Sequence, residues 1–350
     1  MITVSVNASK NYQVIIGSDL SATLIDHIKL LGKTGKAAII SDSNVFPIYG
    51  KMIDDALQKA GMKTCSYVLP AGEESKNGAN YLSILDFLAQ NQLTRSDMLV
   101  ALGGGVIGDI TGFAAATYLR GISFIQIPTS LLAMVDSSVG GKTAIDLPTG
   151  KNLAGAFYQP DLVLCDVKAL DTLPQDVFID GCAEVIKYGI LYDPDLFEHL
   201  YKHGLDFDRE AVIARCVALK RDVVAEDEYD TGARQKLNLG HTIGHGIEAY
   251  SGYTVTHGKA VAIGTVIVSK AGTAKGICDS NTARKITAIL ERFGLPLDTT
   301  ATAEQLFRFA LSDKKRAGSK INLIVPHKIG DCIIHPIAVE DLQAFIKAGL

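Results

Sequence analysis

No CxxC pair occurs in this sequence, and its six cysteines are scattered along the chain. This absence argues against a disulfide framework, because disulfide-rich domains space their cysteines in close, regular patterns. Isolated cysteines are typical of buried structural thiols in a reducing compartment, so we expect a cytoplasmic protein. The cysteines are Cys65, Cys165, Cys182, Cys216, Cys278 and Cys332.

Long hydrophobic runs and a strong excess of one charge are also missing. The longest apolar run, residues 260–268, is interrupted by Gly264 and Thr265 and is far shorter than the roughly 18 to 20 residues of a membrane span. Residues 1–7 lack the basic and apolar regions of a signal peptide. The net charge of −4 gives no reason to expect nucleic acid or an anionic membrane as a partner.

The first half of the chain alternates short apolar runs with amphipathic segments. Since 350 residues can form two domains with separate cores, we expect residues 1–167 to form one of them. The alternation predicts an α/β, Rossmann-like domain with a mostly parallel sheet. The expected strands are 4–6, 14–16, 37–40, 64–69, 98–102, 124–127 and 162–165, and the expected helices are 51–60 and 81–90.

Residues 168–350 are predicted to form an all-helical domain that carries metal- and substrate-binding groups. Within it, residues 321–336 alone regain strand character, with a turn at 328–331. We expect the active site in the cleft between the two domains, where ligand sites are common. The expected helices are 178–192, 210–226, 239–250, 257–275, 281–293 and 303–313.

Four residues of the second half suggest a divalent metal site. His241 and His245 share one face if their segment is helical, His257 follows, and Glu184 lies upstream. One carboxylate and two imidazoles form a common catalytic zinc set that leaves a position open for substrate. Either both His241 and His245 are ligands, or one is a ligand and the other an acid–base or core histidine. Cys182 is a possible soft ligand, although a buried thiol is the favoured interpretation.

A glycine-rich segment indicates a dinucleotide site. Gly103, Gly105 and Gly108 satisfy GxGxxG after a predicted strand and before a predicted helix. There, glycine lets the backbone approach a pyrophosphate at the helix N-terminus. The same spacing also serves tight packing of a helix on a sheet, so both interpretations stay open.

The acidic residue expected about 20 positions beyond a dinucleotide glycine loop is missing, because residues 120–130 contain Arg120 and no carboxylate. Asp42 or Glu73 could hold a ribose instead, and we therefore predict a strand order other than the common one. Asp42 can equally be a turn or cap aspartate.

Several cationic residues lie near glycine-rich loops or on apolar stripes. Lys187 falls one turn after Glu184, and Lys220 interrupts an otherwise apolar helical stripe. A lysine on such a stripe costs free energy unless it is paired, so these two are assigned to an anion rather than to the solvated surface. Arg234, Asn238 and His241 are expected on one helical face. The group as a whole predicts a small ligand with several negative charges, such as a phosphate and a carboxylate.

Together these segments resemble the 3-dehydroquinate synthase family over nearly the whole chain. The resemblance implies a homodimer that uses NAD⁺ and Zn²⁺ or Co²⁺. Such an enzyme converts 3-deoxy-D-arabino-heptulosonate 7-phosphate to 3-dehydroquinate and phosphate in the shikimate route to aromatic amino acids. Transient oxidation would be followed by phosphate elimination, re-reduction and intramolecular aldol closure. The matching segments are residues 70–76, 103–113, 128–143, 150–160, 181–189 and 237–248.

The resemblance also assigns roles to individual residues. The metal ligands would be Glu184, His241 and His257, with His245 as a nearby acid–base or hydrogen-bonding group. Residues implied to contact NAD⁺ are Asp42, Glu73, Lys76, Gly103, Gly104, Gly105, Asp109, Thr129, Ser130, Lys142, Lys151 and Asn152. Residues implied in catalysis are Lys142, Lys187, Lys220, Arg234, Asn238 and His245. Residues implied to bind substrate are Arg120, Asp136, Lys151, Asn152 and Lys314.

Two positions depart from the family pattern, and three other functions compete with it. Met134 stands where glutamine is frequent, and Asp146 where asparagine is frequent. A sister cyclase such as 2-deoxy-scyllo-inosose synthase acts on a substrate without a carboxylate, so Lys220 argues against it. A metal-dependent polyol dehydrogenase would have little use for so many cations. A non-catalytic NAD-binding sensor would not need the metal set.

Overall fold

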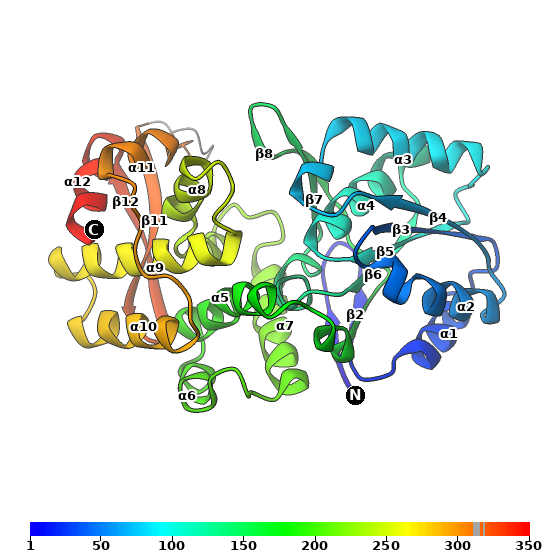
Figure 1. The fold of residues 1–350 in the computed structure, drawn as a ribbon, viewed down its shortest axis with the longest axis horizontal. Coiled ribbons are helices and arrows are strands. Elements are labelled where there is room, and N and C mark those ends of the chain that lie inside the picture. Colours follow the sequence, from blue (N-terminus) through cyan, green and yellow to red (C-terminus); the bar gives the residue numbers. More distant parts are fainter. Residues whose placement is uncertain (311–315, 318) are drawn as a thin grey trace. The chain divides into compact units, whose positions relative to one another are not determined.

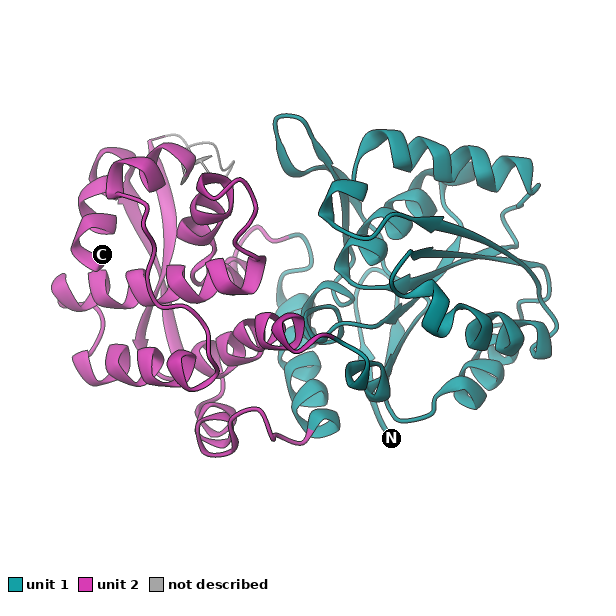
Figure 2. Cartoon of the chain, in the orientation of Figure 1, with its two compact units in different colours: residues 1–173, 209–229 teal, residues 174–208, 230–350 magenta. Residues whose placement is uncertain are grey.

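The computed structural model describes residues 1–310, 316–317 and 319–350. These form two compact units (Figure 2). Unit 1 contains Met1–Leu173 and Arg209–Tyr229, and unit 2 contains Pro174–Asp208 and Asp230–Leu350. The sequence predicts a single boundary at residue 167, whereas in the structure a later segment returns to unit 1. Lys314, expected to bind substrate, lies outside the described residues.

Unit 1 is built on a seven-stranded sheet in the order β1-β2-β9-β6-β5-β3-β4. The first two strands form an antiparallel hairpin, and all other neighbours are parallel. The predicted α/β fold with a mostly parallel sheet is therefore confirmed. The strands are β1 Ile2–Val6, β2 Tyr12–Gly17, β3 Lys36–Asp42, β4 Lys63–Leu69, β5 Met98–Gly103, β6 Ser123–Pro128 and β9 Leu162–Asp166.

Helices cover both faces of this sheet (Figure 1). Side chains of α1 (Ser21–Leu30) and α2 (Lys51–Lys59) join one buried core cluster, and those of α3 (Gly78–Gln90) and α4 (Gly105–Thr117) join the other. All six residues of β5 are buried, as expected for a parallel strand enclosed on both sides. The long apolar runs of the sequence thus become the central strands.

The strand order places a topological switch point between β3 and β5. The chain moves from β3 outward to β4, then returns to add β5, β6 and β9 on the other side. Ligands of open α/β sheets bind outside the carboxyl ends of the strands at such a point. Asp42 ends β3 and Gly103 ends β5, so the two lie at this switch. The prediction of a strand order other than the common dinucleotide-binding one is confirmed.

Two further elements complete unit 1. An antiparallel hairpin, β7 (Lys142–Leu147) and β8 (Gly150–Phe157), packs against α4 and was not predicted from the sequence. Helix α7 (Arg209–Glu226) packs on β1 and β2, at the antiparallel edge of the sheet.

Unit 2 is mainly helical, as predicted, and contains the strand hairpin that residues 321–336 indicated. Helix α9 is buried almost all round and contacts α5, α8, α10 and α12. Across the described part of the chain, no helix combines the length and apolar character needed to cross a bilayer. The elements are α5 Gln175–Leu191, α6 Pro194–His203, α8 His241–Tyr250, α9 His257–Ala274, α10 Ser280–Arg292, α11 Ala303–Ala310, β10 Arg316–Ala317, β11 Lys320–Lys328, β12 Asp331–Ala338 and α12 Val339–Gly349.

Candidate functional site

Three helices of unit 2 bring one carboxylate and two imidazoles together. Glu184 lies in α5, while His241 and His257 are the first residues of α8 and α9. Oε1 of Glu184 is 3.7 Å from Nε2 of each histidine, and the three ligand atoms lie within 4.8 Å of one another. Ligand atoms around a tetrahedral zinc ion are roughly 3.4 Å apart, given bonds of about 2.1 Å. The geometry therefore fits a metal ion.

The surroundings of Glu184 supply an independent test of that fit. Its side chain is 0% exposed, and within the described residues neither carboxylate oxygen has a hydrogen-bond partner. Lys187, itself 2% exposed, forms an ion pair with Oε2, which leaves Oε1 facing the two imidazoles. Burying a carboxylate without hydrogen bonds is costly. A divalent cation held between Oε1 and the imidazoles would remove that cost.

Hydrogen bonds set the orientation of both imidazoles. Nδ1 of His241 lies 3.0 Å from the carbonyl oxygen of Leu239, so Nδ1 carries the proton and Nε2 is free for a metal. Nδ1 of His257 lies 3.5 Å from Oε2 of Glu248, a buried residue that the sequence did not single out. The signal for Glu248 was its place two helical turns after His241, on the same face of α8.

Two nearby carboxylates determine the direction in which the pKa of His257 is shifted. Its pKa is raised to about 10, because burial, which acts to lower it, is outweighed by the nearby carboxylates of Glu184 and Glu248. The metal-free protein therefore carries an imidazolium at this position near neutral pH. A metal ion has to displace that proton.

His245 lies beside this set. Its ring centroid is 5.5 Å from that of His241 and 6.2 Å from that of His257. Its ligand atom groups with those of Glu248 and His257 rather than with that of Glu184. Burial raises the pKa of the Cys182 thiol, and among the described residues Cys182 is not part of either group of converging ligand atoms. Of the two open interpretations, the geometry favours His245 as a neighbour of the ligand set.

Close packing of α8 on α9 creates the pairing of His241 with His257. A Cβ atom on Gly240 would lie 2.4 Å from Oγ1 of Thr265, and one on Gly244 would lie 3.1 Å from the backbone of Ala260. Gly240 also has a φ of +76°, which favours glycine and separates α8 from the segment before it.

This break corrects one expectation. Arg234 and Asn238 lie in a short 3₁₀ segment, Ala233–Asn238, that ends before Gly240, so they do not continue the face of His241. Arg234 is buried, and the Asn238 amide donates to the carbonyl of Gln235 over 3.0 Å.

The glycine loop of unit 1 gathers several of the predicted cofactor residues. A Cβ atom on Gly103 would lie 2.8 Å from Ile107 and 3.3 Å from Oδ2 of Asp42. The N–H of Thr129 donates to the carbonyl of Gly103 over 3.0 Å, and Ser130 Oγ would meet a Cβ on Gly104 at 3.4 Å. The first N–H groups of α4, which have no acceptor within the helix, begin here. Tight packing and anion binding are thus compatible uses of the same glycines.

One carboxylate oxygen of Asp42 makes a turn interaction, and the other faces the glycine loop. Oδ1 accepts the N–H groups of Asn44 and Val45 over 2.8 and 3.0 Å, which is the turn interaction. Oδ2 is the oxygen that faces Gly103. A ribose hydroxyl could bind this second oxygen without disturbing the turn.

A buried lysine links the remaining cofactor residues. Nζ of Lys76 lies 2.7 Å from Asp109 and 3.6 Å from Glu73. Burial, which lowers the pKa of Lys76, is outweighed by these carboxylates, so the lysine stays charged, and burial raises the pKa of Asp109 despite Lys76. The N–H of Asp146 donates to the Lys76 carbonyl over 2.8 Å, and Asp146 accepts the N–H of Asn152 over 2.7 Å. Asp146 thus holds Asn152 at its φ of +54°.

Lys220 pairs within unit 1. It is 5% exposed and donates to the carbonyl oxygen of Asp136 over 2.6 Å as well as forming an ion pair with the Asp136 carboxylate. The sequence predicted an anion beside Lys220, and the structure provides one in the carboxylate of Asp136. Helix α7 is grouped with unit 1, whereas the sequence assigned residues 210–226 to the second domain.

Other predicted residues are more dispersed. Lys142 is exposed at the start of β7, and Lys151 is half-buried near the start of β8. Arg120 is exposed beyond the far end of α4, a helix of 13 residues that is about 20 Å long. Within its own chain the structure therefore does not bring Arg120 together with the glycine loop.

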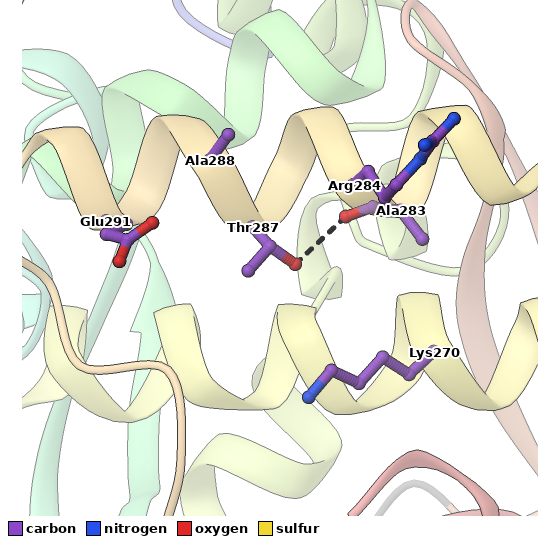
Figure 3. Close-up of a pocket in the computed structure, with 6 residues that line it drawn as sticks. All are labelled: Lys270, Ala283, Arg284, Thr287, Ala288 and Glu291. Atoms are coloured by element: carbon purple, nitrogen blue, oxygen red, sulfur yellow. Dashed lines mark hydrogen bonds between the residues drawn. The ribbon is translucent and has the colours of Figure 1, made fainter.

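A shallow pocket lies between α9 and α10 (Figure 3). The hydroxyl of Thr287 donates to the carbonyl of Ala283 over 2.9 Å in its wall. Lys270, which lines it, is about 20 Å along α9 from His257. This pocket is therefore separate from the cluster of Glu184, His241 and His257. Its lining residues are Lys270, Ala283, Arg284, Thr287, Ala288 and Glu291.

Comparison with known sequences gives a consistent result. Residues 66–180 match the family profile described as 3-dehydroquinate synthase N-terminal, and residues 181–316 match the one described as 3-dehydroquinate synthase C-terminal. The 3-dehydroquinate synthase of Pelobacter propionicus is 45% identical over 355 residues, with 98% of each chain covered. That of Streptococcus suis is 43% identical, with 96% of this chain and 97% of the relative covered.

Solved structures share the fold at lower identity. A 2-deoxy-scyllo-inosose synthase, solved with carbaglucose-6-phosphate, NAD⁺ and Co²⁺, has a TM-score of 0.90, 24% identity and full coverage of both chains. The glycerol dehydrogenase of Schizosaccharomyces pombe has a TM-score of 0.64 and 18% identity, over 99% of this chain and 89% of that one. These similarities concern the fold alone.

The raised pKa of His257 predicts that metal affinity depends on pH. Because one proton must leave for each ion bound, zinc affinity should fall about tenfold per unit as pH is lowered from about 8 to about 6. Competition with a chromogenic chelator at several pH values measures this slope. An affinity that is constant over the range would contradict it.

The Lys76–Asp109 pair predicts a stability effect that is independent of the metal. Lys76→Met leaves the Asp109 carboxylate without its nearest cation and should lower the free energy of unfolding by about 3 kcal/mol. Adding Asp109→Asn should recover part of this loss, since the uncompensated charge is gone. Urea unfolding of the two variants and of the parent chain tests this, and a loss below about 1 kcal/mol for K76M would count against the pair.

Proposed function

The chain belongs to the 3-dehydroquinate synthase family, and on this basis we propose that Glu184, His241 and His257 bind the divalent metal of its reaction. The family reaction converts 3-deoxy-D-arabino-heptulosonate 7-phosphate to 3-dehydroquinate and phosphate, within the shikimate pathway. The protein is thus a cyclising lyase that eliminates phosphate and uses NAD⁺ with Zn²⁺ or Co²⁺.

One observation carries the metal proposal: the fully buried carboxylate of Glu184 faces two imidazole Nε2 atoms and has no hydrogen bond of its own among the described residues. When bound, NAD⁺ exchanges a hydride with the substrate, and the metal polarises the substrate oxygens. The chain's part is to fix the donors. Leu239 and Glu248 do this for the two imidazoles, and Lys187 does it for Glu184.

We assign NAD⁺ binding to the switch point of unit 1. In this proposal Oδ2 of Asp42, which faces Gly103, binds a ribose, and the start of α4 after Gly104 binds the pyrophosphate. The buried Lys76 pairs with Asp109 in α4 and with Glu73, which fixes these two carboxylates next to the proposed cofactor residues. The other residues proposed to contact NAD⁺ are Gly103, Gly105, Thr129, Ser130, Lys142, Lys151 and Asn152.

The substrate carries a phosphate and a carboxylate, which require cationic and amide donors. We assign to His245, half-buried beside the proposed ligand histidines, the role of holding or moving a proton. By holding the substrate in a fixed pose the chain favours the closing intramolecular aldol step. The residues proposed for substrate contact and catalysis are Arg120, Asp136, Lys142, Lys151, Asn152, Lys187, Lys220, Arg234, Asn238 and Lys314.

A homodimer and a cytoplasmic location complete the proposal. The homodimer rests on the family resemblance. The location rests on six cysteines that are all free thiols in the structure. The runner-up function, 2-deoxy-scyllo-inosose synthase, is supported by a fold similarity at 24% identity, against 40–45% for the curated 3-dehydroquinate synthases.

Phosphate release tests the reaction. With the heptulosonate phosphate, NAD⁺ and zinc present, we expect release without net accumulation of NADH, because the hydride returns to the substrate. Omitting NAD⁺ or adding a chelator should abolish it. Release from glucose 6-phosphate instead would favour the sister cyclase, and stoichiometric NADH would favour a polyol dehydrogenase.

Histidine variants separate the ligands from their neighbour. His257→Ala should retain less than about one-tenth of the parent's zinc and lose turnover, because two donors do not hold the ion. His245→Ala should retain zinc while phosphate release slows by about 10²-fold or more. His327→Ala, at an exposed histidine of β11, is the matched control. Zinc content by mass spectrometry gives the first readout, and a fully metallated, active H257A would exclude His257 as a ligand.

A further inference from the structure

One carboxylate of α5 caps the start of α9. Asp180 accepts the N–H of Gly258 over 3.1 Å and that of Lys259 over 2.9 Å, and it also accepts the hydroxyl of Thr256. Thr256 is the N-cap residue of α9, and its own side chain accepts no backbone N–H there. Two backbone N–H groups of this helix start, which have no acceptor within the helix, are therefore satisfied by a residue 78 and 79 positions earlier in the chain.

The two helices touch at this point. A Cβ atom on Gly258 would lie only 1.9 Å from the carbonyl oxygen of Asp180, so the backbones of α5 and α9 are in direct contact. Asp180 precedes Glu184 by four residues, one turn along α5, and His257 lies between Thr256 and Gly258. The cap and the pair of proposed metal donors thus occupy the same junction.

From this arrangement we propose that Asp180 is a positioning residue for the metal site. By fixing the first turn of α9 against α5, it holds Nε2 of His257 at 3.7 Å from Oε1 of Glu184. Helix ends fray when their donors are not capped, and His257 stands at the first position of its helix. The inference rests on the proposed ligand set Glu184, His241 and His257, and it adds a residue outside that set and outside the residues proposed to contact substrate.

The alternative is that Asp180 stabilises unit 2 without any special effect on the site. A second cap in the same unit separates the two cases. Asp279 is the N-cap of α10, and its carboxylate accepts the N–H of Thr282 over 3.1 Å. Because α10 carries no proposed ligand, Asp279→Ala removes a comparable cap without touching the metal-bearing junction.

The experiment compares the parent chain, Asp180→Ala, Asp180→Asn and Asp279→Ala as full-length proteins. Zinc dissociation constants come from competition with a chromogenic chelator, and melting temperatures are recorded for the metal-free proteins. D180A should bind zinc about 10- to 100-fold more weakly, as is typical when a group that orients a ligand is lost. D279A should melt lower than the parent and still bind zinc within about twofold of it.

D180N keeps the shape of the side chain and covers the case in which D180A fails to fold. Its amide oxygen replaces part of the cap while its NH₂ group faces further donors, so zinc binding should weaken by about threefold or more. NAD⁺ affinity should stay at the parent value in both Asp180 variants, because the proposed cofactor residues lie in unit 1.

Three results would overturn the inference. One is an unchanged zinc affinity in the folded Asp180 variants, and another is an equal loss of affinity in D279A. The third is that zinc affinity does not fall when the side chain of Glu184 or His257 is removed. This result alone would also overturn the proposed ligand set.

Discussion

The arrangement of unit 2 depends on a carboxylate placed where water cannot reach it. Glu184 is fully buried, and no hydrogen bond to its oxygens is formed within the described residues. Such a group is tolerable only when cations are close. Lys187 provides one positive charge, and the protonated His257 provides a second in the metal-free chain. A divalent ion can take the place of the proton on His257. The same electrostatic demand therefore explains the lysine, the raised histidine pKa and the metal set.

The starts of α8 and α9 and the middle of α5 converge around this charge by backbone contact rather than by long side chains. Gly240 and Gly244 let α8 approach α9, and Gly258 lets α9 touch α5. A side chain at Gly240 or Gly258 would clash with the neighbouring helix, which would then have to move away. The glycines near the histidines thus serve packing first, and the packing sets the distances between ligands.

Much of this was accessible from the sequence, because the buried strands and amphipathic helices leave clear apolar periodicities. The hairpin of β7 and β8 was missed, since its residues are only partly buried and several are glycine or polar, so no apolar run marks it. Continuity from Arg234 to His241 was predicted wrongly, because the left-handed Gly240 interrupts it. Asp180 was missed for another reason: its partners lie 76 to 79 positions later in the chain, and tertiary packing alone brings them together. Glu248 was missed although it shares a face of α8 with His241, because its partner His257 belongs to the next helix.

The position of α7 in the sequence affects how unit 1 folds during synthesis. Unit 1 takes its last helix from residues 209–226, after the chain has already entered unit 2 at Pro174. Strands β1 and β2 are made first, but α7, which packs on them, is made much later. Their edge of the sheet is therefore uncovered until the ribosome has passed Tyr229. A nascent or truncated chain that stops near residue 173 exposes this edge, and it also lacks Lys220, the buried partner of Asp136.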